Sequence, residues 1–144
     1  MKKFFIPMFL GLLLILSSCA STQVAYTPIT LTKTATVSGS KNEVYVKANL
    51  WLVDIFNSAK SVIQFSDKEA GIIKGKYVLY YIPAAQYIGE LEKDATITLI
   101  ANENQLTITI NCDGRPFGLG FYPLTRMNDD LNGLIDKFTI QFGK

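Results

Sequence analysis

Apolar and polar residues alternate along residues 29–37, where every second position is apolar except Lys33. Alternation with a period of two places one set of side chains on each face of a strand. The segment therefore predicts a half-buried strand, and Ser38-Gly39-Ser40 ends it.

The spacing of apolar residues changes to three and four after Ser40, which is typical of a helix. Ser40 and Glu43 match a capping box, in which each side chain bonds a backbone N–H of the other residue. The expected apolar face contains Val44, Ala48, Trp51, Leu52, Ile55 and Phe56, and the expected polar face contains Lys47, Asn49, Asp54 and Asn57. We predict an amphipathic helix to about Asn57, with Trp51 buried between helix and sheet.

Two pairs of β-rich segments follow, and each pair predicts a hairpin. The first pair is residues 61–65 and 71–82, and the second is residues 95–101 and 106–111, after a loop that includes residues 89–94. Gly75 indicates either a bulge or a close approach of backbone. Threonines alternate with apolar residues in the second hairpin, which predicts one buried face and one face lined by hydroxyls.

A last helix is expected after Thr125. Asn128, Asp129 and Asp130 would supply negative charge to its first turn. The spacing of Leu131, Leu134, Ile135 and Phe138 predicts an apolar face. Residues 138–142 are rich in β-forming residues, so the sequence does not decide where this helix ends.

Residues 1–22 have the order of a secretory signal: Lys2 and Lys3, an uncharged run over residues 4–16, and then Leu16-Ser17-Ser18-Cys19. These last four residues resemble the bacterial lipobox, whose cysteine receives a diacylglycerol. An uncleaved span would need roughly 20 apolar residues, and a plain signal peptide cut near Ala20 would leave Cys19 without a role. We therefore expect a signal peptide over residues 1–18, a lipidated and palmitate-bearing Cys19 with a tether to residue 28, and one domain over residues 29–144.

Charge and composition exclude several classes of function. Removal of Lys2 and Lys3 with the signal lowers the Lys+Arg count from 14 to 12, equal to the 12 Asp+Glu, so the mature side chains have no net charge. This balance argues against a nucleic-acid partner. The chain has no histidine, and only Cys112 remains after lipidation. We therefore expect no internal disulfide, no metal site, no cofactor and no catalytic residue.

The loop within residues 111–118 contains the side chains best suited to bind a ligand. Arg115 could hold a carboxylate or phosphate through two hydrogen bonds, and Asp113 and Phe117 flank it. Turn formation by Asp113-Gly114 and Pro116 accounts for the same residues without a ligand. We predict a binding loop at Asp113, Arg115 and Phe117, and a small buried thiol at Cys112.

The chain from about Thr36 to Ala101 resembles a Bacteroidota envelope family, domain of unknown function 4468, which has a TBP-like fold. The resemblance rests on Tyr45, Ala48, Trp51 and Leu52, on residues 61–65, and on the run from Asp67 to Lys76 with its Gly-x-Ile-x-Gly pattern. It implies an α+β fold in which helices pack on one face of a curved antiparallel sheet, in the order strand, helix, strands, helix. It implies no established activity, and the TBP name describes shape only.

These observations favour a lipoprotein of the cell envelope. Residues 20–24 lack acidic side chains, which in such bacteria favours the periplasmic side of the outer membrane. The leading hypothesis is a non-catalytic binding or scaffolding module for another envelope protein. One alternative is a carrier of an apolar small molecule, based on Tyr77, Tyr80, Tyr81, Phe117, Phe121 and Tyr122. A less favoured one is a carboxylate hydrolase using two of Asp67, Glu69 and Asp113.

Overall fold

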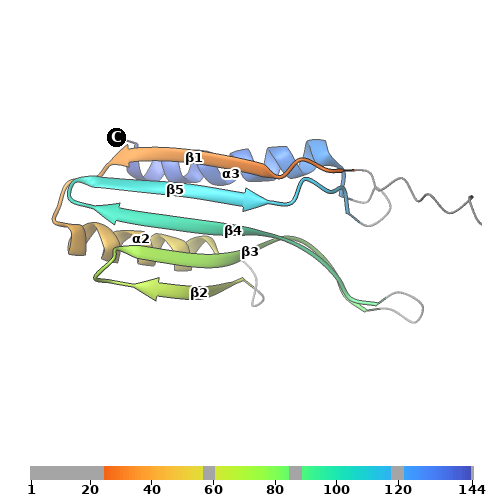
Figure 1. Ribbon diagram of the computed structural model, residues 1–144, viewed down its shortest axis with the longest axis horizontal. Coiled ribbons are helices and arrows are strands. Elements are labelled where there is room, and N and C mark those ends of the chain that lie inside the picture. The colour runs from red at the N-terminus through yellow and green to blue at the C-terminus, as the bar shows by residue number, and fades with distance from the viewer. Residues whose placement is uncertain (1–24, 57–60, 85–88, 118–121, 144) are drawn as a thin grey trace, which may run out of the picture.

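The computed structural model describes residues 25–56, 61–84, 89–117 and 122–143 (Figure 1). The elements are β1 (Ile29–Thr36), α2 (Lys41–Ile55), β2 (Val62–Asp67), β3 (Ile72–Ile82), β4 (Leu91–Asn102), β5 (Gln105–Cys112) and α3 (Leu124–Phe142). Cys19 and the expected signal peptide lie outside these residues, as does Phe121. Within them, no helix has the length and apolar character that a membrane span requires.

The strands form one sheet in the order β1-β5-β4-β3-β2, and every neighbouring pair is antiparallel. The first strand of the sequence therefore lies at one edge, beside β5, with Ile29 opposite Cys112. Both helices cover the same face of the sheet. Figure 1 shows α3 behind β1 and β5, and α2 behind β4 and β3. The predicted α+β class, with helices on one face of an antiparallel sheet, is confirmed.

The core lies between the sheet and the two helices. Its most deeply buried side chains are Ile97, Leu99, Leu106, Ile108 and Ile110 from the sheet, Leu52 from α2, and Leu131 and Phe138 from α3. Each such side chain contributes about 1.5–3 kcal/mol through burial. The predicted periods of two in the strands and of three and four in the helices thus identified the core.

The predicted capping box starts α2. The backbone N–H of Ser40 donates to Glu43 Oε2 at 2.8 Å, and the Glu43 N–H donates to Ser40 Oγ at 3.4 Å. The Ser40 hydroxyl also donates to Glu43 Oε2, at 2.9 Å. The bonds that the Ser40 N–H and hydroxyl donate to this carboxylate favour its charged form and lower the pKa of Glu43. The helix ends at Ile55, so Asn57 lies beyond it and outside the described residues.

Two predicted boundaries are wrong. Residues 91–94 were expected in a loop, but they belong to β4 because they pair with the end of β3, with Leu91 opposite Ile82. The first turn of α3 begins at Leu124, after Pro123, so Asp129 and Asp130 lie in the second turn rather than the first. The helix continues through residues 138–142 because Phe138 and Phe142, four residues apart, are both buried against Trp51.

Gly75 allows α2 to approach the sheet closely. A Cβ added there would lie 2.6 Å from Phe56 Cζ and 3.4 Å from Leu52 Cδ2, so the glycine leaves space for both side chains. The neighbouring strand β2 carries an irregularity between Ile63 and Phe65. Of the two alternatives at Gly75, close approach is therefore correct for this residue, and the bulge lies opposite it in β2.

Candidate functional site

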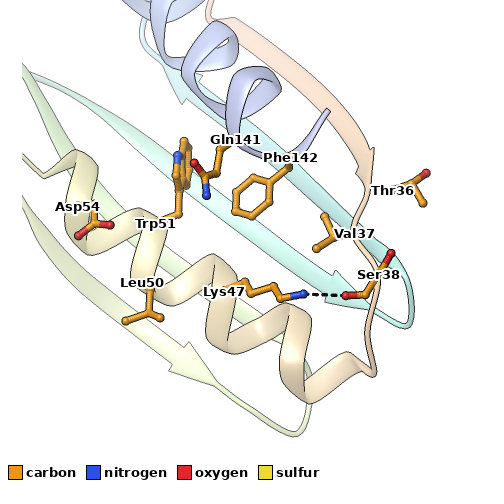
Figure 2. Close-up of a pocket in the computed structure, with 9 residues that line it drawn as sticks. All are labelled: Thr36, Val37, Ser38, Lys47, Leu50, Trp51, Asp54, Gln141 and Phe142. Carbon is orange, nitrogen blue, oxygen red and sulfur yellow. Dashed lines mark hydrogen bonds between the residues drawn. The ribbon is translucent and has the colours of Figure 1, made fainter. Parts of the chain in front are cut away.

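A groove of about 710 Å³ lies between α2, the end of α3 and the turn that follows β1 (Figure 2). The residues that line it are Thr36, Val37, Ser38, Lys47, Leu50, Trp51, Asp54, Gln141 and Phe142. Its volume is within the range of small-ligand pockets.

Apolar side chains form the inner wall of this groove. Trp51 is 7% exposed, and its ring meets the Phe142 ring edge-on at 5.8 Å between centroids. Trp51 also contacts Phe138, at 5.7 Å between ring centroids, so it joins the two helices. The rim is polar: Lys47 Nζ donates to the Ser38 carbonyl at 2.8 Å (Figure 2). The groove thus has an apolar wall with one cation and one anion, Asp54, at its edge.

The predicted binding loop is attached to β4 by a buried lysine. Lys93 is 5% exposed, and its ammonium binds both the carboxylate and the backbone carbonyl of Asp113, the latter at 2.8 Å. The second carboxylate oxygen of Asp113 lies 3.3 Å from the Arg115 guanidinium. Two cations therefore engage Asp113 already, and its role in this structure is to anchor the loop.

Lys93 was not among the predicted site residues, because residues 89–94 were expected in a loop. The signal was present in the alternation Leu91, Lys93, Ala95 and Ile97, which places a lysine among inward-facing positions. Burial lowers the pKa of Lys93, and the neighbouring Arg115 acts in the same direction, whereas Cys112 and Asp94 raise it. A carboxylate contact at Asp113 is the arrangement that such a buried cation requires.

Phe117 is half-buried in a cluster of aromatic rings. It meets Tyr80 edge-on at 6.5 Å, and Tyr80 stacks on Tyr122 at 5.1 Å. The Arg126 guanidinium lies 5.6 Å from the Tyr80 ring and 5.7 Å from the Tyr122 ring. The Tyr122 hydroxyl donates to Asp130 at 2.7 Å, and burial together with this bond raises the pKa of Tyr122. These aromatic residues pack against one another and against Arg126.

Arg115 is the member of the predicted loop that is most open to solvent. Its side chain is 67% exposed and borders a cavity of about 340 Å³ beside Lys93, Asp113 and Phe117. Cys112 is buried beneath the loop, and its thiol donates to the Asp94 carbonyl at 3.3 Å. Burial raises the pKa of this thiol, which makes it a poor nucleophile.

The second face of the sheet carries three parallel rows of side chains. From β2 to β1 the rows are Val62-Lys76-Thr96-Asn111-Thr30, Phe65-Lys74-Thr98-Thr109-Thr32 and Asp67-Ile72-Ile100-Thr107-Thr34. Hydroxyls bond across β1 and β5, at 3.0 Å between Thr34 and Thr107 and 3.3 Å between Thr32 and Thr109. The predicted hydroxyl-lined face is therefore present, and its polar groups partly satisfy one another.

Apolar side chains gather at the β2 end of these rows. Val62, Phe65 and Ile100 are between 37% and 48% exposed, and Ile72 lies beside them. We call these four residues the β2 patch. The bulge in β2 places both Val62 and Phe65 on this face although they are three residues apart.

Two lysines next to the β2 patch differ in their partners. Lys76 Nζ lies 2.7 Å from Glu92 and is half-buried. Lys74 is exposed, and no described carboxylate lies within ion-pair distance of it. Lys74 therefore brings a free positive charge to the row that contains Phe65.

Asp113 does not share a cleft with the other two acids of the hydrolase hypothesis. Asp67 accepts from the Ala70 N–H at 2.9 Å in the β2–β3 turn, close to Glu69. Asp113 follows the end of β5, and Figure 1 shows that β5 ends at the opposite end of the sheet from the β2–β3 turn. Among the residues that the structure describes, no group of three acids or cysteines could hold a metal ion.

A family model matches residues 32–112, which is more than half of the chain. The family is described as a domain of unknown function (DUF4468) with TBP-like fold. The chain belongs to this DUF4468 family. The match extends past the expected limit at Ala101 and includes all of β5, whereas the Asp113–Phe117 loop lies just beyond it.

One solved structure supports the same fold, and two others are less similar. A DUF4468 family protein from Bacteroides ovatus is similar with a TM-score of 0.55 and 13% identity, over 80% of this chain and 86% of that chain. A TBP-like protein from Parabacteroides distasonis is similar with a TM-score of 0.45 and 14% identity, over 62% of this chain and 57% of that chain. The Zhui aromatase/cyclase from Streptomyces is similar with a TM-score of 0.44 and 14% identity, over 80% of this chain and 88% of that chain. Identities this low bear on the fold alone. No curated protein matches the chain.

Proposed function

We propose that this DUF4468 protein is a lipid-anchored binding module of the cell envelope that holds a partner protein on the uncovered face of its sheet. The observation that carries the proposal is the β2 patch with Lys74 in its middle row. Exposed apolar side chains grouped on one face are typical of an interaction site. The module itself carries out no chemistry.

The composition of this face favours a protein partner that presents apolar side chains and a carboxylate. Lys74 has no described ion-pair partner, so an acidic group can bind it without displacing another. The hydroxyls and amides on β4, β5 and β1 offer hydrogen bonds around the apolar area, as the rim of a protein interface does. Lys74 and Lys76 are the only cations in the three rows, and Lys76 is already paired with Glu92, which is too little positive charge for nucleic acid.

The anchor in this proposal is lipidated Cys19, with the domain on the periplasmic side of the outer membrane. Ten Cα-to-Cα steps separate Cys19 from Ile29, so a fully extended tether reaches about 34 Å from the membrane surface. The domain would then meet partners that lie on or close to the same membrane.

Site-specific photocrosslinking tests the sheet-face proposal. A photoreactive phenylalanine at Thr98 of the full-length protein, in the bacterium that encodes it, should give a discrete protein adduct. The same residue at Thr125, which is exposed on α3, should not. Lys74→Glu should weaken the adduct about tenfold, because it places like charges together, and Lys74→Arg should retain it.

The control is the same charge reversal on the other face of the sheet. Lys33 is exposed on β1 and pairs in register with the inward-facing Ile108, so Lys33→Glu should leave the Thr98 adduct unchanged. Equal adducts at Thr98 and Thr125, or an adduct insensitive to Lys74→Glu, would show that this face does not bind the partner.

A second candidate function, the carrying of an apolar small molecule, is supported by the groove between α2 and α3. Its wall of Trp51, Phe142 and Val37 can accept an aliphatic chain, and Lys47 at the rim can accept a carboxylate headgroup. Trp51 is the single tryptophan of the chain, so its fluorescence reports on this groove alone.

Titration with dodecanoate should therefore produce a saturable change in tryptophan fluorescence, whereas butyrate should not, because it buries too little apolar surface. Leu50→Gln should weaken dodecanoate binding, since Leu50 lines the groove. Val62→Gln is the matched control, because Val62 is similarly exposed but lies on the other face of the sheet. A linear change in fluorescence, or an equal effect of both variants, would reject the carrier.

A further inference from the structure

Helix α2 carries a second apolar surface on the side away from the sheet. Val46, Leu50 and Val53 are 45%, 60% and 54% exposed. At 3.6 residues per turn they fall within about 60° of one another, which makes a continuous stripe. These positions correct the predicted polar outer face, which contains Lys47, Asn49 and Asp54 but also this stripe. A helix that is apolar on two opposite sides normally has a neighbour on both.

Two opposite charges lie on one side of this stripe. Lys47 and Asp54 are seven residues apart, about 10.5 Å along the helix axis, and lie on the same side of Leu50. Neither residue has an ion-pair partner among the residues that the structure describes. Lys47 donates one hydrogen bond to the Ser38 carbonyl, and the Glu43 carboxylate one turn earlier attracts it without forming an ion pair.

We infer that α2 binds α2 of a second copy of this chain, antiparallel, about a twofold axis beside Leu50. An antiparallel pair with this axis places residue 47 of one helix level with residue 54 of the other. Lys47 then faces the partner's Asp54, and symmetry repeats the ion pair. The twofold axis brings the valine side of one helix against the valine side of the other, so Val46 lies beside the partner's Val53. The two Leu50 side chains meet at the centre.

Charge complementarity selects a second copy over other occupants of the stripe. Lys47 and Asp54 have a spacing that is matched by its own reversal, which is the requirement for a twofold interface. Glu43, on the same side one turn before Lys47, is held by Ser40 in the capping box. An anionic membrane surface would favour an excess of Lys or Arg at these positions. The α2 pair leaves the β2 patch free, because that patch lies on the other face of the sheet. The dimer therefore does not depend on the proposed partner.

Cysteine crosslinking in membranes tests the dimer with the full-length protein. Leu50→Cys should form a disulfide-linked dimer on mild oxidation, because the twofold axis brings the two positions together, and the native Cys112 is buried. Ile140→Cys is the control: Ile140 is the more exposed residue, at 72%, but it lies on α3 away from the stripe. It should give little dimer.

Charge reversal distinguishes this dimer from chance collision. Within Leu50→Cys, either Lys47→Glu or Asp54→Lys should lower the crosslinked fraction about tenfold, because each replaces two attractive pairs with two repulsive ones. Coexpression of the two variants should restore crosslinking between them, since every pair in the mixed dimer is again of opposite sign. The double reversal in one chain should also restore it, which excludes misfolding as the cause.

Two results would overturn the proposal. One is a Leu50→Cys dimer no more abundant than the Ile140→Cys dimer. The other is crosslinking that both charge reversals leave unchanged. Neither result would alter the expected Thr98 adduct, so the dimer and the proposed function fail independently.

Discussion

Asp113→Asn should lower the free energy of unfolding by about 2 kcal/mol at neutral pH. Asparagine keeps the size and an acceptor oxygen, so the change isolates the loss of negative charge beside Lys93. Lys93 is 5% exposed, and its ammonium would then be without the carboxylate that binds it. Complete removal of a partner from a fully buried pair costs about 3–5 kcal/mol, and the half-exposed position of Asp113 reduces the cost here.

The deficit of Asp113→Asn should shrink as the pH rises. Burial lowers the pKa of Lys93 below its ordinary value of 10.5 in the folded chain. Between the lowered value and 10.5 the unfolded chain binds more protons, so stability rises with pH in this window. Without Asp113 the pKa of Lys93 falls further, so the pH range over which stability rises becomes wider. Urea denaturation of both proteins at pH 7 and pH 10 measures this difference.

Two variants control for other causes. Asp136→Asn removes an exposed acid of α3 and should change stability by less than about 0.5 kcal/mol. Lys93→Met in the Asp113→Asn background removes the unpaired cation and should recover most of the loss. An equal deficit at pH 7 and pH 10, or no recovery with methionine, would exclude the buried ammonium as its source.

Cys19→Ala should move the protein from the membrane fraction to the soluble envelope fraction. Each buried methylene of an acyl chain contributes about 0.8 kcal/mol, and stable anchoring needs two or more chains, which a lipidated cysteine supplies. The variant should also lose incorporation of labelled palmitate. Fractionation and labelling together measure whether the lipid is the anchor.

Ser21→Ala is the matched control, because it leaves Leu16-Ser17-Ser18-Cys19 intact and should remain with the membrane. A Cys19→Ala protein that still sediments with membranes would show that something other than the lipid holds it there. The dimer and sheet-face experiments would still be interpretable in that case, because they depend on the folded domain.

Local patterns predicted most of the fold but less of the site. The capping box at Ser40 and Glu43 and the periods of the core residues depend on neighbours in the sequence, and the structure contains them. Lys93 was missed because this part of its strand is defined by pairing with β3, between residues 9 to 16 positions apart. Asp113 was predicted to bind a ligand, yet a lysine 20 residues earlier occupies its carboxylate.

By itself, the sequence determined most of the segments that form strands and helices and the side chains that they bury, and its residues 16–19 resemble a lipobox. These properties follow from spacing within single elements, where the geometry of strand and helix is known in advance. Only the tertiary structure decided that β1 lies beside β5, that Trp51 joins the two helices, and that the β2 patch and the α2 stripe remain exposed. Exposure depends on what packs against a face, and that is set by contacts between segments far apart in the chain.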